Sequence, residues 1–233
     1  MSTRLKKSEK NCPIISTHDK FEEAHYFLHK MIDTYHFPTN FRYNLNAFLQ
    51  ALRNITFMLQ SEKNKPENFE EWYAKKQSKM QKSRILRKMV KGRNILVKKS
   101  MLKFRSKVGE GLFRGRQYKL LFDSNCSPFM SSEELLEITK KAMIGWLIDK
   151  EHSEIGEQLG IERTWVVSEI SRNEIVGVCY EALWDMFEIV KEAHGLYNFR
   201  LENDELNCLN NFEEQRVLLE TDLDPTLIRK WKW

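Results

Sequence analysis

The 233-residue sequence lacks the features that would place it in several common classes. No apolar run approaches the roughly 20 residues that a membrane-spanning helix needs. The basic residues at the N-terminus are not followed by the apolar stretch of a secretory signal. The four cysteines stand far apart without a CxxC pair, which argues against a disulfide framework and a zinc site. We therefore expect a cytoplasmic protein with reduced thiols, no cofactor and no metal.

Positive charge is concentrated in the first half of the chain. Residues 1–120 hold 27 Lys and Arg against 10 Asp and Glu, whereas the other 113 residues hold 11 against 23. Between Lys75 and Lys119, 17 basic residues accompany a single acid, Glu110. Like charges at this density repel one another, so an anionic partner is needed to neutralise them. We expect RNA or another polyanion, because each cation that neutralises a phosphate adds affinity.

Two other counterparts for this charge stay open. The first is the chain's own acidic stretches, such as Glu133, Glu134 and Glu137, or Glu202, Asp204 and Glu205. The second is an anionic membrane surface. The apolar residues of the basic region are too scattered for an interfacial helix, so we expect no membrane partner.

Apolar residues recur at helical spacing through the first hundred residues. The spacing predicts helices over residues 19–36 and from about 41 to 61. Asn68, with Glu71 three positions later, has the reciprocal capping pattern that begins a third helix. This helix is expected to continue through the basic stretch to Gly92. The charge is therefore predicted to lie along a helical surface.

The pattern changes after residue 106, where glycines and aromatic residues replace the helical period. A loop or short hairpin is expected there. Helical patterns return from Ser131 to about Asp149 and over residues 174–194. The predicted fold is mainly α, with four parts: a flexible N-terminus (1–18), a helical bundle (19–105), a loop or hairpin connection (106–130) and a C-terminal helical region packing on the bundle (131–233).

Residues 153–171 have the outline of a helix-turn-helix, with Gly160 at the turn. This outline supports an alternative function as a DNA-binding regulator. The expected recognition helix, from Glu162 to Glu169, holds one basic residue and is acidic as a whole, which opposes approach to phosphates. A packed helical hairpin is the other interpretation of the segment.

His25, His29 and Asp33 recur at four-residue spacing. On a helix they would share one side and could bind a metal ion. No further set of ligands accompanies them in the sequence. We therefore expect a partly exposed polar stripe at this position.

Two Arg-Asn dipeptides, Arg53-Asn54 and Arg93-Asn94, lie in FRYNLNAFLQALRNITFML and KGRNILVKKSML. Together with the first amphipathic helix and FEEWYAKKQSKM, they make residues 19–105 resemble a HEPN domain. In active members of that family, two copies meet across a cleft and cleave RNA without a metal. The resemblance implies a helical bundle, a homodimer and a metal-independent endoribonuclease of a toxin or antiviral defence system, with a protein partner from the same system.

The resemblance also assigns roles to residues. Arg93 would stabilise charge on the phosphate, Asn94 would orient the cleft, and Lys98 occupies the position of the family's histidine. A lysine holds its proton at neutral pH and is a poor base, although it can hold a phosphate. The cations expected to contact nucleic acid are Lys79, Lys82, Arg84, Arg87, Lys88, Lys91 and Lys99. The noncatalytic alternative is a scaffold for an acidic protein partner.

Overall fold

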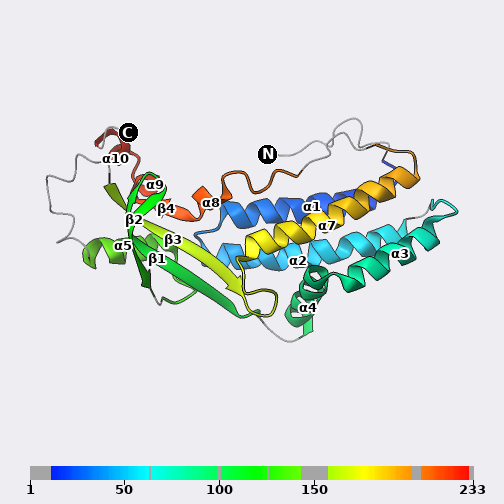
Figure 1. The fold of residues 1–233 in the computed structure, drawn as a ribbon, viewed down its shortest axis with the longest axis horizontal. Coiled ribbons are helices and arrows are strands. Elements are labelled where there is room, and N and C mark those ends of the chain that lie inside the picture. The colour runs from blue at the N-terminus through cyan, green and yellow to red at the C-terminus, as the bar shows by residue number, and fades with distance from the viewer. Residues whose placement is uncertain are drawn as a thin grey trace.

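The computed structural model describes residues 12–62, 64–98, 101–124, 126–142, 157–200 and 206–230. Long helices gather at one end of the molecule and an antiparallel sheet at the other (Figure 1). Strand β3 (Glu157–Val167) belongs to the sheet, and its C-terminal end points toward the helices. None of the helices described is both long enough and apolar enough to cross a bilayer.

Three long helices form the helical body: α1 (Ile15–Asp33), α2 (Pro38–Ser61) and α7 (Ile175–Leu196). Their apolar residues face one another at helical spacing, as the sequence predicts, and build the larger core of the protein. Pro38 occupies the first turn of α2, where its missing N–H has no intrahelical partner to lose. The chain therefore turns between α1 and α2 at the predicted place.

The basic stretch forms two helices, α3 (Phe69–Lys82) and α4 (Arg84–Lys98). They are separated by Ser83, whose backbone is extended with φ −64° and ψ 120°. The Oγ of Ser83 accepts a hydrogen bond from the backbone N–H of Leu86 at 3.3 Å, as a helix cap does. The prediction of one continuous helix is therefore wrong, because a capping serine interrupts it.

Gly92 lies inside α4, where glycine lowers helix stability relative to alanine. A Cβ at this position would stand 2.9 Å from Cδ1 of Ile170 and 3.6 Å from Cδ1 of Leu49. The missing side chain therefore lets α4 pack closely against α2 and against the turn that follows β3.

The sheet contains four antiparallel strands in the order β2-β1-β3-β4. Strands β1 (Phe104–Arg114) and β2 (Gln117–Ser124) form a hairpin, which confirms the hairpin expected after residue 106. The hairpin turns at Gly115, whose φ of 56° is accessible to glycine at no steric cost. Strand β4 (Val217–Leu219) pairs with the middle of β3.

Short helices flank the sheet. Helix α5 (Ser132–Ala142) packs its buried leucines against β1 and β3, and its expected extension to Asp149 falls outside the described residues. After α7 the chain returns to the sheet through three elements: α8 (Phe212–Gln215), α9 (Glu220–Leu223) and α10 (Thr226–Lys230). Arg116 of the hairpin binds both carboxylate oxygens of Asp222 at 2.8 and 3.0 Å and so fixes α9 to the sheet.

The predicted mainly α fold is wrong, because the protein combines helices with this four-stranded sheet. The largest difference lies at β3, where the sequence predicts a helix-turn-helix. In the middle of the strand, the buried Ile161, Arg163 and Trp165 alternate with the partly exposed Glu162 and Thr164, which is the period of two of a strand. Toward both ends of β3, residues 158–160 and 166–167 are buried without alternation. Its partners β1 and β4 come from distant parts of the sequence.

Hydrogen bonds join the helical body to β3 and to the short helices beside the sheet, and the two that involve β3 are buried. We call this set the helix–sheet seam, and it consists of Tyr35, His36, Ser132, Arg163, Trp165 and Gln215. Trp165 Nε1 donates to the carbonyl of Tyr35 at 2.8 Å, and the Tyr35 hydroxyl donates to the carbonyl of Arg163 at 3.0 Å. His36 contacts Ser132 Oγ at 2.8 Å and the carbonyl of Gln215 at 2.9 Å.

Candidate functional site

A cavity of about 780 Å³ opens between α2, α3, α4 and α7. Its volume is within the range of roughly 300–1,000 Å³ that is typical of ligand pockets. Most of its wall is apolar and comes from Leu49, Leu52, Tyr73, Met80, Leu86, Met89, Ile95 and Met186. The cavity therefore offers an apolar surface to a ligand.

Four cations line the same cavity: Arg53 from α2 and Arg87, Lys91 and Lys98 from α4. The three on α4 share one face with Asn94, because these positions are three or four residues apart, or multiples of that spacing. No Asp or Glu is among the described residues that line the cavity. A positive potential therefore surrounds an apolar interior, and this combination suits a ligand that has both an apolar and an anionic group.

The charges of α3 and α4 are neutralised to different extents. On α3, Lys75 pairs with Glu71 at 2.6 Å and Lys76 pairs with Glu192 of α7. Helix α4 carries six cations and no acid. None of these six forms an ion pair with any carboxylate in the described parts of the chain. Neutralisation within the chain therefore reaches Lys75 and Lys76 of α3, through Glu71 and Glu192 rather than through the acidic groups named from the sequence. The cations of α4 stay available to an external anion.

Arg53 is held at the cavity by neighbours on its own helix. Its Nη1 donates to Thr56 Oγ1 at 2.8 Å, and its Cζ lies 4.2 Å from the ring centroid of Phe57. The latter is a cation–π contact. Tyr73 lines the cavity across from it, and burial raises the pKa of this phenol, so Tyr73 remains a neutral hydroxyl. The guanidinium is therefore positioned before any ligand arrives.

The structure brings four of the predicted site residues together at the cavity: Arg87, Lys91, Asn94 and Lys98. Arg93 is not among the lining residues. Its Nη1 lies 3.4 Å from Asn94 Oδ1, and its buried Nε has no hydrogen-bond partner in the described structure. The other cations predicted to contact nucleic acid do not line the cavity either: Lys79, Lys82, Arg84 and Lys88. Lys99 falls outside the described residues.

From the sequence, Arg53 belongs to an Arg-Asn dipeptide, and no contact with a ligand is predicted for it. A signal was present, since Arg53, Thr56 and Gln60 recur at helical spacing beside the inward leucines of α2. What the sequence does not reveal is that this stripe faces α4. Only the packing of the two helices brings Arg53 to Asn94.

The helix-turn-helix interpretation is wrong for the described part of residues 153–171. Arg163, its single basic residue, is fully buried in β3 and donates from Nη2 to the carbonyl of Met130 at 2.7 Å. The neighbouring Thr164 binds Arg216 through its hydroxyl at 2.6 Å. These side chains hold the sheet together and are not available to DNA.

Two groups of side chains in the described residues could hold a metal ion: His25, His29 and Cys208, and Cys12, His18 and His194. Asp33, which the sequence places beside His25 and His29, is instead bound by Lys30 at 2.8 Å. The third member of that group is Cys208, whose Sγ lies 3.1 Å from His25 Nε2. Neither cysteine could be assigned from sequence spacing.

The fold and the cavity define a mixed α/β protein with a cation-lined apolar pocket on its helical body. The chain belongs to the bacteriophage lambda protein ea47 family, whose model matches residues 6–222. It is similar to Protein ea47 of Escherichia phage lambda, with 29% identity over 160 residues, which are 67% of this chain and 38% of that protein. The match thus covers little more than a third of that relative. No solved structure matches the chain.

The resemblance to a HEPN domain is therefore wrong. Both comparisons place the chain in the ea47 family, and the sheet is foreign to an all-helical bundle. The ribonuclease activity and the toxin or antiviral context implied by that resemblance lose their basis with it. The geometry agrees, since Arg93 does not line the cavity and no histidine is among the described residues that do.

Proposed function

We propose that this ea47-family protein binds single-stranded RNA at the cavity. Backbone phosphates lie along Arg87, Lys91 and Lys98, and a base enters the apolar interior. One observation above all supports the proposal. Within the part of the chain that the structure describes, a row of cations without ionic partners lies beside an apolar wall that holds no carboxylate. Proteins that bind single strands combine these two elements, a cationic groove for the backbone and a surface for the bases.

The electrostatics favour a phosphate-bearing ligand. Arg53 offers a planar fork of N–H donors, and the lysines act as compact point charges. Hydrogen bonds between such groups and phosphate are about twice as strong as neutral ones. Because no carboxylate of the described residues lines the cavity, a phosphate there does not have to displace an anion from among them.

A second candidate occupant is an acidic amphipathic helix from a protein partner. It is favoured by the three methionines of the wall, Met80, Met89 and Met186, because methionine adapts to irregular apolar side chains. The noncatalytic scaffold inferred from the sequence has this chemistry. RNA remains the preferred ligand because the row of cations on α4 extends along the helix.

The test compares two double variants with the same change in charge. Arg87→Gln with Lys91→Gln removes two cavity cations, whereas Lys79→Gln with Lys82→Gln removes two exposed cations of α3 that do not line it. Binding of a fluorescent single-stranded RNA is measured by anisotropy over a range of salt. We expect the cavity variant to lose roughly 10- to 100-fold in affinity, and its salt slope to fall by about 1.4, the value for two lost contacts to a single strand.

The outcomes separate the candidates. Equal losses in both double variants would show a diffuse charged surface and reject the cavity. No RNA binding at low salt, together with binding of an acidic helical peptide that the cavity variant loses, would favour the protein partner. A DNA strand of the same sequence, measured in parallel, tests the choice of RNA over DNA.

A further inference from the structure

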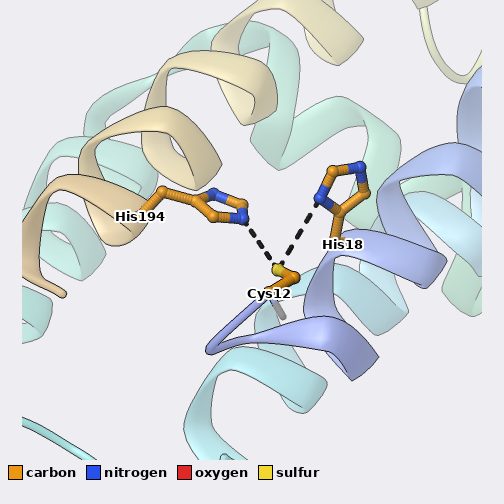
Figure 2. A group of neighbouring side chains, drawn as sticks. All are labelled: Cys12, His18 and His194. Carbon is orange, nitrogen blue, oxygen red and sulfur yellow. Dashed lines mark hydrogen bonds between the residues drawn. The ribbon is translucent and has the colours of Figure 1, made fainter. Parts of the chain in front are cut away.

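A group of three side chains with the chemistry of metal ligands lies at the N-terminal end of α1. Cys12 precedes the helix, His18 lies in its first turns, and His194 comes from the last turn of α7 (Figure 2). Cys12 Sγ is 3.1 Å from His194 Nε2 and 3.9 Å from His18 Nδ1. The ligand atoms of all three lie within 4.8 Å of one another. Both imidazoles therefore direct a nitrogen toward one sulfur.

These separations fit a shared metal ion. In a tetrahedral zinc site with Zn–S about 2.3 Å and Zn–N about 2.05 Å, the sulfur and nitrogen atoms stand about 3.6 Å apart. The two distances in the structure, 3.1 and 3.9 Å, lie on either side of that value. Side-chain adjustments of about half an ångström would complete the geometry.

The outer nitrogen of each imidazole lies near an acceptor. His194 Nδ1 donates to the carbonyl of Val190 at 2.8 Å, so its Nε2 directs a lone pair toward Cys12. Histidines that bind metals usually donate their second N–H to a carbonyl or a carboxylate, which fixes the ring and its tautomer, and His194 is held in this way. His18 Nε2 lies 3.7 Å from Glu22 Oε1, which is the separation of an ion pair and not of a hydrogen bond.

The three side chains are shielded from solvent to different extents. Cys12 is 8% exposed, His194 is fully buried and His18 is half-buried. A metal ion bound there would be largely screened from water. A thiolate with two imidazoles is a ligand set that suits zinc better than the hard cations Mg²⁺ or Ca²⁺.

We propose that Cys12, His18 and His194 bind one zinc ion, which fastens the segment before α1 to the C-terminal end of α7. Three protein ligands leave a fourth coordination position for water or another donor. This site is separate from the cavity on α4, so the two proposals stand or fall independently.

The second group, His25, His29 and Cys208, provides an internal comparison. His29 is exposed, and its Nε2 lies 3.0 Å from His25 Nε2, a distance that an ordinary hydrogen bond explains. No acceptor in the described residues holds its other nitrogen. His18 and His25 are seven positions apart, about 10.5 Å along α1, which is too far for one two-metal centre. The structure therefore favours the first group.

The test measures zinc in protein purified without chelators, by elemental analysis, and zinc affinity by competition with a chromophoric chelator. The wild type should carry about one zinc per chain. Cys12→Ser and His18→Gln should each bind zinc at least 100-fold more weakly, whereas Cys208→Ser, the matched control, should match the wild type. Cobalt added to the wild type should give a thiolate-to-metal absorption band that Cys12→Ser lacks.

Folding of each variant is checked by far-UV circular dichroism. His18→Gln keeps a side chain that can reach Glu22, so it reports on the site even if Cys12→Ser does not fold. Equal zinc affinity in the wild type and His18→Gln would overturn the proposal. Loss of zinc in Cys208→Ser with retention in both first-group variants would also overturn it, because the metal would then lie in the second group.

Discussion

The helix–sheet seam and the cavity on α4 both contain polar side chains, but these differ in whether they are bonded within the protein. In the seam, the buried hydroxyl of Tyr35, the imidazole of His36 and the indole N–H of Trp165 all have partners. At the cavity, Arg87 and Lys91 are exposed and form no ion pair in the described structure. The bonded side chains of the seam hold this fold together, although Nε and Nη1 of the buried Arg163 have no partner among the described residues. Arg87 and Lys91 at the cavity are exposed as well as unpaired, and it is this combination that makes them available to a ligand. Substitutions in the two regions should therefore affect different measurements.

The largest effect on stability is expected at Trp165. Its ring stacks on Phe41 with centroids 5.0 Å apart, and the side chain is fully buried. Trp165→Ala should lower the free energy of unfolding by about 3–5 kcal/mol, measured by urea denaturation. Trp184→Ala is the control, because Trp184 is 37% exposed. If Trp165→Ala lowers the free energy of unfolding no more than Trp184→Ala does, the seam is not the structural junction. Because Trp165 is not part of the cavity wall, the folded Trp165→Ala variant should keep the affinity of the wild type for RNA.

A smaller effect is expected from the protonation of His36. Burial, together with the charges of Arg163 and Arg116, lowers the pKa of His36 to about 4, although Asp222 and the carbonyl of Gln215 act in the opposite direction. The unfolded imidazole has a pKa of about 6.5. As the pH falls from 6.5 to 4, the unfolded state takes up a proton that the folded state does not. Stability from this group is therefore complete above pH 6.5 and is lost toward pH 4.

The expected loss is about 2 kcal/mol, below the full value for such a shift, because His36 is partly exposed. Glu174 acts against it, because burial raises the pKa of that carboxyl to about 7 and so favours the folded state as the pH falls below 7. Comparing urea denaturation of the wild type and His36→Gln at each pH isolates the histidine. Parallel curves for the two proteins would refute a role for His36 in the pH dependence.

Ser83 should give an intermediate result, because it belongs to neither region. Its Oγ caps α4 and also lies 3.3 Å from Asp185 Oδ2 on α7. Ser83→Ala should lower the free energy of unfolding by about 1 kcal/mol. Thermal unfolding measures this loss, and Ser78→Ala on the exposed side of α3 is the control. A destabilisation equal to that of Trp165→Ala would mean that Ser83 does more than cap the helix.

The smallest effect on stability is expected at the cavity. Arg87→Gln should change the free energy of unfolding by no more than about 0.5 kcal/mol, because no ion pair is lost. The same variant should weaken RNA binding severalfold in the anisotropy measurement. A marked loss of stability in Arg87→Gln would show that Arg87 has a structural partner, and the cavity would then not differ from the seam in this respect.

The sequence predicts the helical body well and the sheet poorly, for a physical reason. Helices α1, α2 and α7 show their buried face within a single stretch, at spacings such as Phe21, Ala24 and Leu28. A strand shows its burial only when its partners are known. In β3 the helix-turn-helix prediction uses Gly160 as a turn and takes Leu159 and Ile161 as helix core, whereas in the structure Gly160 lies within the strand and pairs with Gly111.

The candidate site was predictable in composition and not in geometry. The charge run points to α4, but the choice of Lys91 over Lys88 as a cavity residue depends on how α4 packs on α2. The zinc ligands are harder still, because Cys12 and His194 are separated by 182 positions. Only the antiparallel arrangement of α1 and α7 brings the ends of these helices together (Figure 1).

Gly92 separates two functions on neighbouring positions of α4. It faces Ile170 and α2, while its neighbour Lys91 faces the cavity. A Cβ at position 92 would first meet the end of the Ile170 side chain, which does not line the cavity. The spacing between α4 and the turn after β3 can therefore be altered at this position without changing any side chain of the cavity wall.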